Sequence, residues 1–574
     1  GSAFAPQFAP DGESIAYLGR REGESTTQVY RIAIAGGEAE RLTDTRTSVR
    51  ELEWSPDGNA IAYTTEVEPT AEEKAAKIAG RDWKLGDVDG TRRQLFVLTL
   101  GDDEAKAVTP REFHVERFRW SPRGDAFALV GGERADVDAT MMYGGVFEVA
   151  RAGGVPQRLC PTQGKLGTLA WSPDGSTVAF LGASDLHDPT PGVVFTVPAA
   201  GGKARARTLA YAGTGQWLAF TGNDTLVVLA NEGTQSAVQR LSLRDDALAR
   251  VTKDGPVCHD VDVARQGTVL ACAGDTAEHP AELFVGSTRG GKLRRLSHSN
   301  PQLERKRLGA QQVVKWNGPD GLEIAGVLTK PVGWSARTRY PLVVLPHGGP
   351  EGISLAGWNT RAGYPAQLFA TRGYMVLEPN YRGSSGRGVA FGKADQKDLG
   401  GKEFADVLAG IDMLVEQGLV DPERVGMGGW SYGGYFSGLA ATQHTKRFRA
   451  AMVGAAITDW MSFTGTTEIE HENSLVHWNL WPYDEHELAW MRSPMAHTKG
   501  AKTATLVVHG LDDSRVPPEQ AKELYRALRH AGVTTELVLY PREGHGLAER
   551  AHQIDFVGRY LDWFDEHLAP TTAK

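Results

Sequence analysis

The stretch Val425 to Tyr435 reads VGMGGWSYGGY and decides the fold of the second half of the chain. It contains Gly-x-Ser-x-Gly at Gly429, Ser431 and Gly433, after an apolar approach and before a helix-compatible run. This context predicts a nucleophile elbow, a strained turn from strand to helix that lifts the serine Oγ above a sheet. Glycines are needed there because neighbouring backbone comes close. A glycine-rich turn with an incidental serine is the alternative, since the pentapeptide alone is common.

Buried-type strands and amphipathic helices alternate on both sides of the elbow. After a hairpin at 313–328, the sequence predicts strands at 342–345, 374–377, 425–430, 450–453, 505–508 and 536–540. It predicts helices near 365–371, 402–417, 435–442, 519–530 and 553–567. Continuous apolar strands separated by helices indicate a mostly parallel sheet with helices on both faces. We therefore expect an α/β-hydrolase catalytic domain over residues 301–574, joined through a polar linker at 299–307.

A serine nucleophile needs an acid and a base, which follow it in this fold in the order Ser, Asp or Glu, His. The loop after the 505–508 strand offers two carboxylates, Asp512 and Asp513. The loop after the 536–540 strand offers His545 between two glycines, as the base that takes the proton of Ser431. His509 precedes the acid, which is the wrong order, so a structural role is expected for it.

An oxyanion hole requires two preorganised N–H donors. One donor is predicted at Tyr432, at the N-terminus of the helix after the serine. The other is predicted in the loop after the 342–345 strand, which reads His347-Gly-Gly-Pro350. Gly348 and Gly349 are both candidates there, and Gly349 is preferred. A plain turn is the alternative interpretation.

The first half of the chain contains an internal repeat. Four units open on an aromatic residue, a proline and a glycine at Phe8–Gly12, Trp54–Gly58, Trp120–Gly124 and Trp171–Gly175. Six hairpin turns follow at 36–37, 102–103, 153–154, 201–202, 245–246 and 290–291. Hairpins at this period are typical of four-stranded propeller blades. We predict an all-β propeller over residues 1–300 that gates the access of substrate. Six repeats are visible in the sequence, and a propeller with a seventh blade is the alternative.

The first spacing between hairpin turns, from 36–37 to 102–103, is long because it contains an insertion from Pro69 to Lys84. Residues 70–77 are predicted to form a helix, and the insertion ends in a loop at 87–90. Its charge run is interpreted as a solvated helix face, with substrate binding as the alternative.

Bulk composition excludes several partner classes. The 574 residues carry 62 Lys and Arg against 71 Asp and Glu, a net charge of −9, with no basic cluster for nucleic acid or an anionic membrane. The three cysteines, Cys160, Cys258 and Cys272, have no metal-ligand spacing, and Cys258 and Cys272 are predicted to be buried thiols rather than a disulfide. Glycine-rich 381–388 lacks the Gly-Lys of a phosphate loop. We expect no metal and no cofactor.

Location and assembly are less determined. No transmembrane run or signal peptide is present, which predicts a cytoplasmic protein. The opening Gly1-Ser2 is typical of an expression scar, so removal of a native leader sequence stays an alternative. Assembly into a homo-oligomer is an alternative to a monomer.

Taken together, the motifs resemble the prolyl oligopeptidase family of serine peptidases, and within it the acylaminoacyl peptidases and bacterial dipeptidyl peptidases. The matching segments are the Trp-Ser-Pro-Asp-Gly blades, 347–350, 380–384, Gly400-Gly401 with Asp406, 429–434, 513–517 and 543–546. The resemblance covers nearly the whole chain. It implies a propeller that caps an α/β-hydrolase, with the active site between them and peptides rather than folded proteins as substrates.

The resemblance also assigns residues. It implies Asp513 as the acid, two residues before Arg515, and it implies that Arg515 contacts the substrate carbonyl one residue before the cleaved one. A surface salt bridge is the alternative for Arg515. The pocket wall is expected from Ile457, Trp460, Phe463, Trp478 and Trp481, although these aromatic residues could equally belong to the core.

The preferred hypothesis is a serine peptidase that releases N-acylated residues from short peptides through an acyl-enzyme. A dipeptidyl peptidase or oligopeptidase of the same family is the alternative. The only adjacent glutamate pair in the propeller half, Glu72-Glu73, lies in the insertion, which favours blocked N-termini over free ones. Two alternatives lie outside peptidases: a general carboxylesterase or lipase, and a non-catalytic binding platform built on the propeller.

Overall fold

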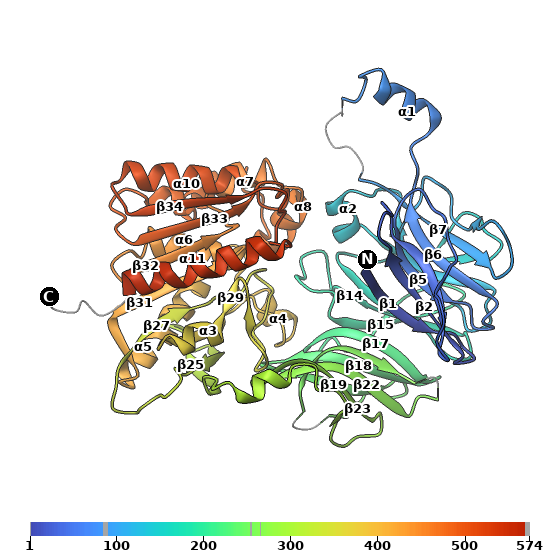
Figure 1. Cartoon of the computed structure of the whole chain (residues 1–574), viewed down its shortest axis with the longest axis horizontal. Coiled ribbons are helices and arrows are strands. Elements are labelled where there is room, and N and C mark those ends of the chain that lie inside the picture. Colours follow the sequence, from blue (N-terminus) through green and yellow to red (C-terminus); the bar gives the residue numbers. More distant parts are fainter. Residues whose placement is uncertain (1, 84–89, 253–254, 265, 569–574) are drawn as a thin grey trace.

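A computed structural model describes residues 2–83, 90–252, 255–264 and 266–568. The chain forms two bodies, a propeller from its first half and an α/β sandwich from its second half (Figure 1). The 3-10 segment η1 (Pro301–Arg305) lies between the last propeller strand and the first strand of the large sheet. We propose that the domain boundary lies there.

Six four-stranded antiparallel sheets make up the propeller, and the described residues contain no seventh. Their strands are β1 (Ser2–Phe8), β2 (Ser14–Arg20), β3 (Gln28–Ala33), β4 (Glu40–Arg41), β5 (Val49–Trp54), β6 (Ala60–Glu66), β7 (Arg93–Thr99), β8 (Lys106–Ala107), β9 (His114–Trp120), β10 (Ala126–Gly132), β11 (Gly145–Ala150), β12 (Gln157–Cys160), β13 (Leu166–Trp171), β14 (Thr177–Gly182), β15 (Val193–Pro198), β16 (Arg205–Ala206), β17 (Thr214–Gly222), β18 (Thr225–Glu232), β19 (Gln235–Ser242), β20 (Leu248–Arg250), β21 (Val257–Val263), β22 (Val269–Thr276), β23 (His279–Ser287) and β24 (Arg294–Arg295). The six predicted repeats are confirmed as six blades.

The repeated tryptophan joins the second, third and fourth blades each to the blade before it. The indole Nε1 donates to a main-chain oxygen of the preceding blade from Trp54 to Gln7 (3.3 Å), from Trp120 to Glu53 (3.2 Å) and from Trp171 to Arg119 (3.3 Å). The turn after each tryptophan has the predicted chemistry. The Asp57 carboxylate, for example, accepts from the Asn59 amide at 3.1 Å, and Gly58 has φ +72°.

The insertion in the second blade carries α1 (Ala71–Ile78), close to the predicted helix. Thr70 and Glu73 form a capping box, which fixes the start of α1. None of its residues is buried, as expected for a solvated helix. The predicted loop at 87–90 lies mostly outside the described residues, which resume at Gly90. A second helix in the propeller half, α2 (Val137–Met142), was not predicted.

An eight-stranded sheet forms the centre of the second body, in the order β25-β26-β30-β27-β31-β32-β33-β34. From β30 to β34 in this order, each strand is parallel to the next one. The pairs β25–β26 and β26–β30 are antiparallel. The strand bounds are β25 (Gln311–Asn317), β26 (Glu323–Thr329), β27 (Tyr340–Val344), β30 (Met375–Asn380), β31 (Val420–Trp430), β32 (Ala450–Gly454), β33 (Ala504–Gly510) and β34 (Thr535–Tyr540), with a small hairpin of β28 (Thr360–Arg361) and β29 (Tyr364–Pro365). This confirms the predicted mostly parallel sheet.

Helices cover both faces of this sheet. Their bounds are α3 (Ala366–Thr371), α4 (Val389–Gly392), α5 (Lys402–Glu416), α6 (Tyr432–Ala441), α7 (Trp460–Thr464), α8 (Glu470–Glu472), α9 (His486–Met491), α10 (Glu519–His530) and α11 (Arg550–Leu568), with the short turns η2 (Asn473–Trp478) and η3 (Pro494–His497). The segment from α7 to η2 is predicted only as a pocket wall, and α9 and η3 are not predicted, since these turns are too short for a helical period to be seen.

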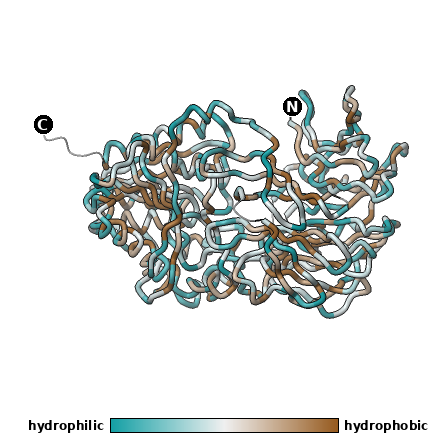
Figure 2. Tube along the Cα trace, turned by 90° about the horizontal axis from the view of Figure 1, so that it is seen from below, coloured by the Kyte–Doolittle hydropathy of each residue, from teal (hydrophilic) through white to brown (hydrophobic). Residues whose placement is uncertain are grey.

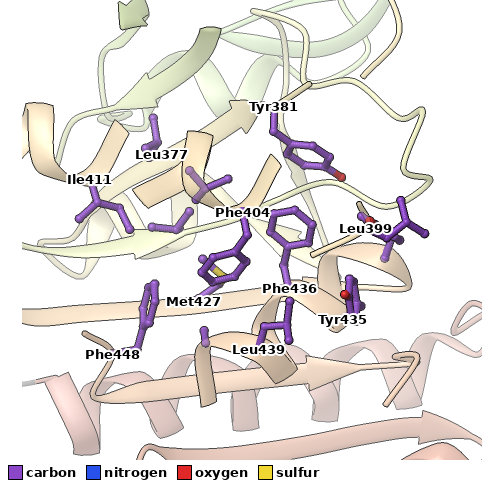
Figure 3. Close-up of a cluster of buried hydrophobic side chains, with 14 of the residues drawn as sticks. Leu377, Tyr381, Leu399, Phe404, Ile411, Met427, Tyr435, Phe436, Leu439 and Phe448 are labelled. Atoms are coloured by element: carbon purple, nitrogen blue, oxygen red, sulfur yellow. The ribbon is translucent and has the colours of Figure 1, made fainter. Parts of the chain in front are cut away.

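Alternation along β31 decides how closely the helices approach. Met427 points into the larger core cluster, with Phe404 of α5 and Phe436 of α6 (Figure 3). Gly428 points to the other face, where an added Cβ would lie 1.9 Å from the Tyr560 hydroxyl of α11. The glycines between the apolar residues of the quoted stretch therefore let α11 pack directly on the strand that carries the elbow.

Apolar residues lie mainly inside both bodies, along the strands (Figure 2). All three cysteines are buried free thiols, as predicted for Cys258 and Cys272. Within the described part of the chain, no helix is both long enough and apolar enough to cross a membrane.

Candidate active site

Ser431 occupies the turn between β31 and α6 with φ +61° and ψ −124°. Positive φ is strained for a residue with a Cβ, and such strain concentrates at functional sites. The surroundings explain the glycines. A Cβ on Gly429 would lie 2.6 Å from the carbonyl carbon of Gly433, and a Cβ on Gly433 would lie 2.1 Å from the Pro346 oxygen. The turn therefore has the geometry that the sequence predicts for an elbow.

The structure brings Ser431, His545 and Asp513 together in hydrogen-bonding order. His545 Nε2 lies 2.9 Å from Ser431 Oγ, and His545 Nδ1 lies 2.8 Å from Asp513 Oδ2. This spacing suits a base that takes a proton from the serine while a carboxylate holds its other nitrogen.

Asp513, and not its neighbour Asp512, faces the histidine. The Asp513 side chain is fully buried, whereas Asp512 is exposed. Burial by itself raises the pKa of the Asp513 carboxyl, but hydrogen bonds from His509 and His545 outweigh burial and hold this pKa below its ordinary value. Asp513 Oδ1 also accepts the amides of Arg515 and Val516 at 3.0 and 2.9 Å. His509 supports this loop, because its Nε2 donates to the Val516 oxygen at 2.7 Å.

The loop that carries His545 is held by Glu543, whose role the sequence did not indicate. Glu543 is buried, and its carboxylate accepts the amides of Ala548 and Glu549 at 2.6 and 2.9 Å. Its Oε1 also lies 2.7 Å from His552 Nδ1 on α11. The motif around His545 thus contains its own anchor to the last helix. Only its position two residues before the histidine could have suggested this.

The segments that carry the two predicted oxyanion donors, Tyr432 and Gly349, both adjoin the serine. Tyr432 is the first residue of α6, where N–H groups have no partner within the helix. On the other side, a Cβ on Gly348 would lie 3.3 Å from the Ser431 Cβ, so the His347–Pro350 loop contacts the serine directly. Gly349 has φ +125°, which explains why this position needs glycine.

Ser431, His545 and the residues of the predicted oxyanion hole line one cavity of about 820 Å³ between the two bodies. The predicted wall residues Ile457, Trp460 and Phe463 line it, as do Ser431, Tyr432 and Arg515. The expectation for Trp478 and Trp481 is wrong, because neither lines this cavity. Trp478 packs behind Trp460, edge-on at 5.2 Å, and Trp481 packs on His471 and Tyr483.

Arg515 has the features of both predicted alternatives, a residue of the cavity wall and a member of a salt bridge. It lines the cavity, and its Nε lies 3.1 Å from Glu468 Oε1 in an ion pair that is partly exposed on both sides. The ion pair thereby holds the guanidinium at the cavity wall.

Below the elbow helix lies a buried carboxyl group, Glu403 on α5. The Tyr432 hydroxyl donates to Glu403 Oε1 at 3.0 Å, and Glu403 is fully buried. Burial raises the pKa of Glu403 to about 8.

Glu403→Gln should therefore stabilise the protein increasingly as the pH rises. Between pH 4.5 and 8 the folded state retains a proton on Glu403 that the unfolded chain releases, so this group lowers stability as pH increases through that window. The gain of the glutamine variant over the parent should grow by at most about 1.4 kcal/mol per pH unit. Thermal or denaturant unfolding of both proteins at pH 5 and pH 8 measures it. A difference that does not change with pH would contradict this account.

The fold and the site define an α/β-hydrolase with a serine at its elbow, capped by a propeller. Residues 360–571 match the prolyl oligopeptidase family. This match covers most of the hydrolase part of the chain, and the protein is a serine peptidase, as the motifs indicate.

Individual relatives agree with this assignment. An uncharacterized peptidase, YuxL of Bacillus subtilis, is 26% identical over 98% of this chain and 90% of its own length. The acylamino-acid-releasing enzyme of Rattus norvegicus is 30% identical over 43% of this chain and 34% of its own length. The acylaminoacyl peptidase of Pyrococcus horikoshii has a similar fold, with a TM-score of 0.81, 20% identity, and coverage of 100% of this chain and 89% of that one.

Proposed function

We propose that the protein hydrolyses short peptides and releases N-acylated N-terminal residues through an acyl-enzyme. The observation that carries the proposal is the hydrogen-bonded chain from Ser431 through His545 to Asp513, at the wall of a cavity between the two bodies. An N-acylated substrate is favoured because the insertion pair Glu72-Glu73 lines none of this cavity, and Glu73 is used to cap α1.

Each residue has a defined role in this proposal. Ser431 Oγ attacks the scissile carbonyl, and His545 takes the serine proton and then gives it to the leaving amine. Asp513 orients His545 and stabilises its protonated form. The N–H groups of Tyr432 and Gly349 stabilise the oxyanion. Water then attacks the acyl-enzyme, with His545 again acting as the base, and frees the acylated residue.

Substrate recognition is assigned to the rest of the cavity. Arg515 is proposed to bind the carbonyl one residue before the cleaved one, and Ile457, Trp460 and Phe463 to hold the side chain before the cleaved bond. The propeller, residues 1–300, is proposed to limit substrate size, because the cavity lies between it and the catalytic domain, residues 301–574. The cytoplasmic location stays a prediction.

A panel of acetyl-, formyl- and free-amine peptides of graded length tests the proposal. We expect kcat/KM to be highest for acylated peptides of a few residues and to fall with length. A preference for free-amine dipeptides would favour a dipeptidyl peptidase. Turnover of p-nitrophenyl esters together with background turnover of every peptide would favour a carboxylesterase, and inertness to all of them would favour a binding platform.

A further inference from the structure

Four ionisable side chains meet on the wall of the cavity that holds Ser431, and the proposed mechanism uses none of them. Lys165 Nζ lies 2.7 Å from Glu351 Oε1 and 2.5 Å from Glu472 Oε1. His477 Nε2 lies 3.4 Å from Glu351 and 3.7 Å from Glu472. All four line the cavity. We call Lys165, Glu351, Glu472 and His477 the lysine-centred cluster.

The cluster joins separate parts of the chain. Lys165 directly precedes β13 of the propeller, whereas the other three residues belong to the hydrolase. The Lys165 side chain is only 9% exposed and that of Glu472 only 4%. A second propeller residue, Asp138, accepts the amides of His471 and Glu472 at 2.7 and 2.8 Å and so fixes the Glu472 backbone. Contacts from both the propeller and the hydrolase therefore fix the position of the Lys165 ammonium.

The cluster lies on the side of the cavity where the N-terminal part of a substrate is expected. Glu472 belongs to the same wall segment as Glu468, which pairs with Arg515, the predicted contact for the carbonyl before the cleaved residue. Glu351 lies two residues after Gly349, the predicted oxyanion donor. A substrate bound by both would place its N-terminal end along this wall.

Two carboxylates at this place, Glu472 buried and Glu351 partly buried, would by themselves suit a substrate ammonium. Here an ammonium of the protein is already between them. Burial by itself lowers the pKa of Lys165, but Glu351 and Glu472 outweigh burial and raise this pKa, so the side chain stays charged. Glu351, Glu472 and His477 also have the spacing of a metal site, with ligand atoms within 4.8 Å, but Lys165 occupies the cation position.

We propose that Lys165 is a specificity-determining residue that takes the place of a substrate α-ammonium, so that the site rejects free N-termini and accepts N-acylated ones. This inference rests on the proposed function, and it identifies Lys165 as the group that discriminates between free and acylated N-termini. A free α-ammonium would meet a like charge and find both carboxylates already paired, whereas an acetylated terminus carries no charge.

Two anilide substrates test the inference, acetyl-alanine p-nitroanilide and glycyl-alanine p-nitroanilide. They differ only in that an ammonium replaces one hydrogen of the acetyl methyl group. The measured quantity is the ratio of kcat/KM for the glycyl substrate to that for the acetyl substrate. Lys165→Met should raise this ratio by about tenfold or more, because the repelling charge is lost and two carboxylates are exposed to the ammonium.

Two further variants control for charge and folding. Lys165→Arg keeps the cation and should leave the ratio within about threefold of the parent. The double variant Lys165→Met/Glu472→Gln retains only the Glu351 carboxylate. The net charge of its lysine, glutamate and substituted side chains is therefore −1, as in the parent, where one lysine faces two glutamates. It should still show the raised ratio, and it carries the test if the single variant does not fold. Labelling of Ser431 by a fluorophosphonate reports whether each variant has an intact site.

The outcomes separate the two claims. An unchanged ratio in a folded Lys165→Met or double variant, with a parent that prefers the acetyl substrate, would overturn the inference and leave the proposed function standing. A parent that prefers the glycyl substrate would overturn both. A raised ratio in the methionine variants alone, with the arginine variant unchanged, would establish Lys165 as the discriminating group.

Discussion

Ser431→Ala is expected to lower kcat/KM for acylated peptide anilides by about 10⁴- to 10⁶-fold. The loss follows from the geometry, because the alanine variant lacks the Ser431 Oγ that lies 2.9 Å from His545 Nε2. Folding should be unaffected, since removing Oγ leaves the turn and its glycine neighbours in place. Steady-state kinetics with thermal unfolding of both proteins measure the two effects.

The matched control is Ser437→Ala on the same helix. The Ser437 hydroxyl bonds back to the Gly433 oxygen at 2.9 Å and lies away from the cavity lining, so this variant should keep parental activity. Adding His545→Ala to Ser431→Ala should cost little more, because residues that act as a unit are not additive. Parental turnover by Ser431→Ala would exclude the serine mechanism.

Asp513→Asn is expected to reduce kcat by about 10⁴-fold while KM changes little. The amide cannot stabilise a protonated His545, and its NH₂ group favours the wrong histidine tautomer. The buried loop should persist, because the Asn oxygen can still accept the amides of Arg515 and Val516. Kinetics over a range of substrate concentrations separate kcat from KM.

Its neighbour supplies the control. Asp512→Asn makes the same chemical change one residue earlier, at an exposed side chain, and should leave both constants near those of the parent. Equal losses in the two variants would mean that loss of a negative charge in the loop, rather than contact with His545, is responsible.

Much of the fold could be predicted because its signals are local. The Pro-Asp-Gly turns and tryptophans mark the blades, and the apolar strands mark the parallel sheet. The helix after Ser431 begins three residues earlier than predicted, since Tyr432 to Gly434 are helical although two of them are glycines. Close packing requires those glycines: a Cβ on Gly434 would lie 2.3 Å from the Gly454 oxygen. Tertiary contacts there override helix propensity.

Some residues of the candidate site could likewise be predicted from the sequence, and others could not. Ser431, Asp513 and His545 follow strands in a known order, so their meeting could be foreseen. The lysine-centred cluster could not, because its four residues come from distant segments and carry no motif. The sequence predicts Trp478 on the pocket wall because it lies in the segment that follows Ile457. The structure instead buries it behind Trp460, since an aromatic residue in a wall segment can face either the cavity or the core.

The most direct test of the central claim is to map the residue modified by a fluorophosphonate, by mass spectrometry of peptides from the labelled protein. The account predicts a single adduct on Ser431, absent from Ser431→Ala, and slowed by an acetylated dipeptide bound in the cavity. An adduct on another serine, or labelling of Ser431 that no acylated peptide slows, would contradict it.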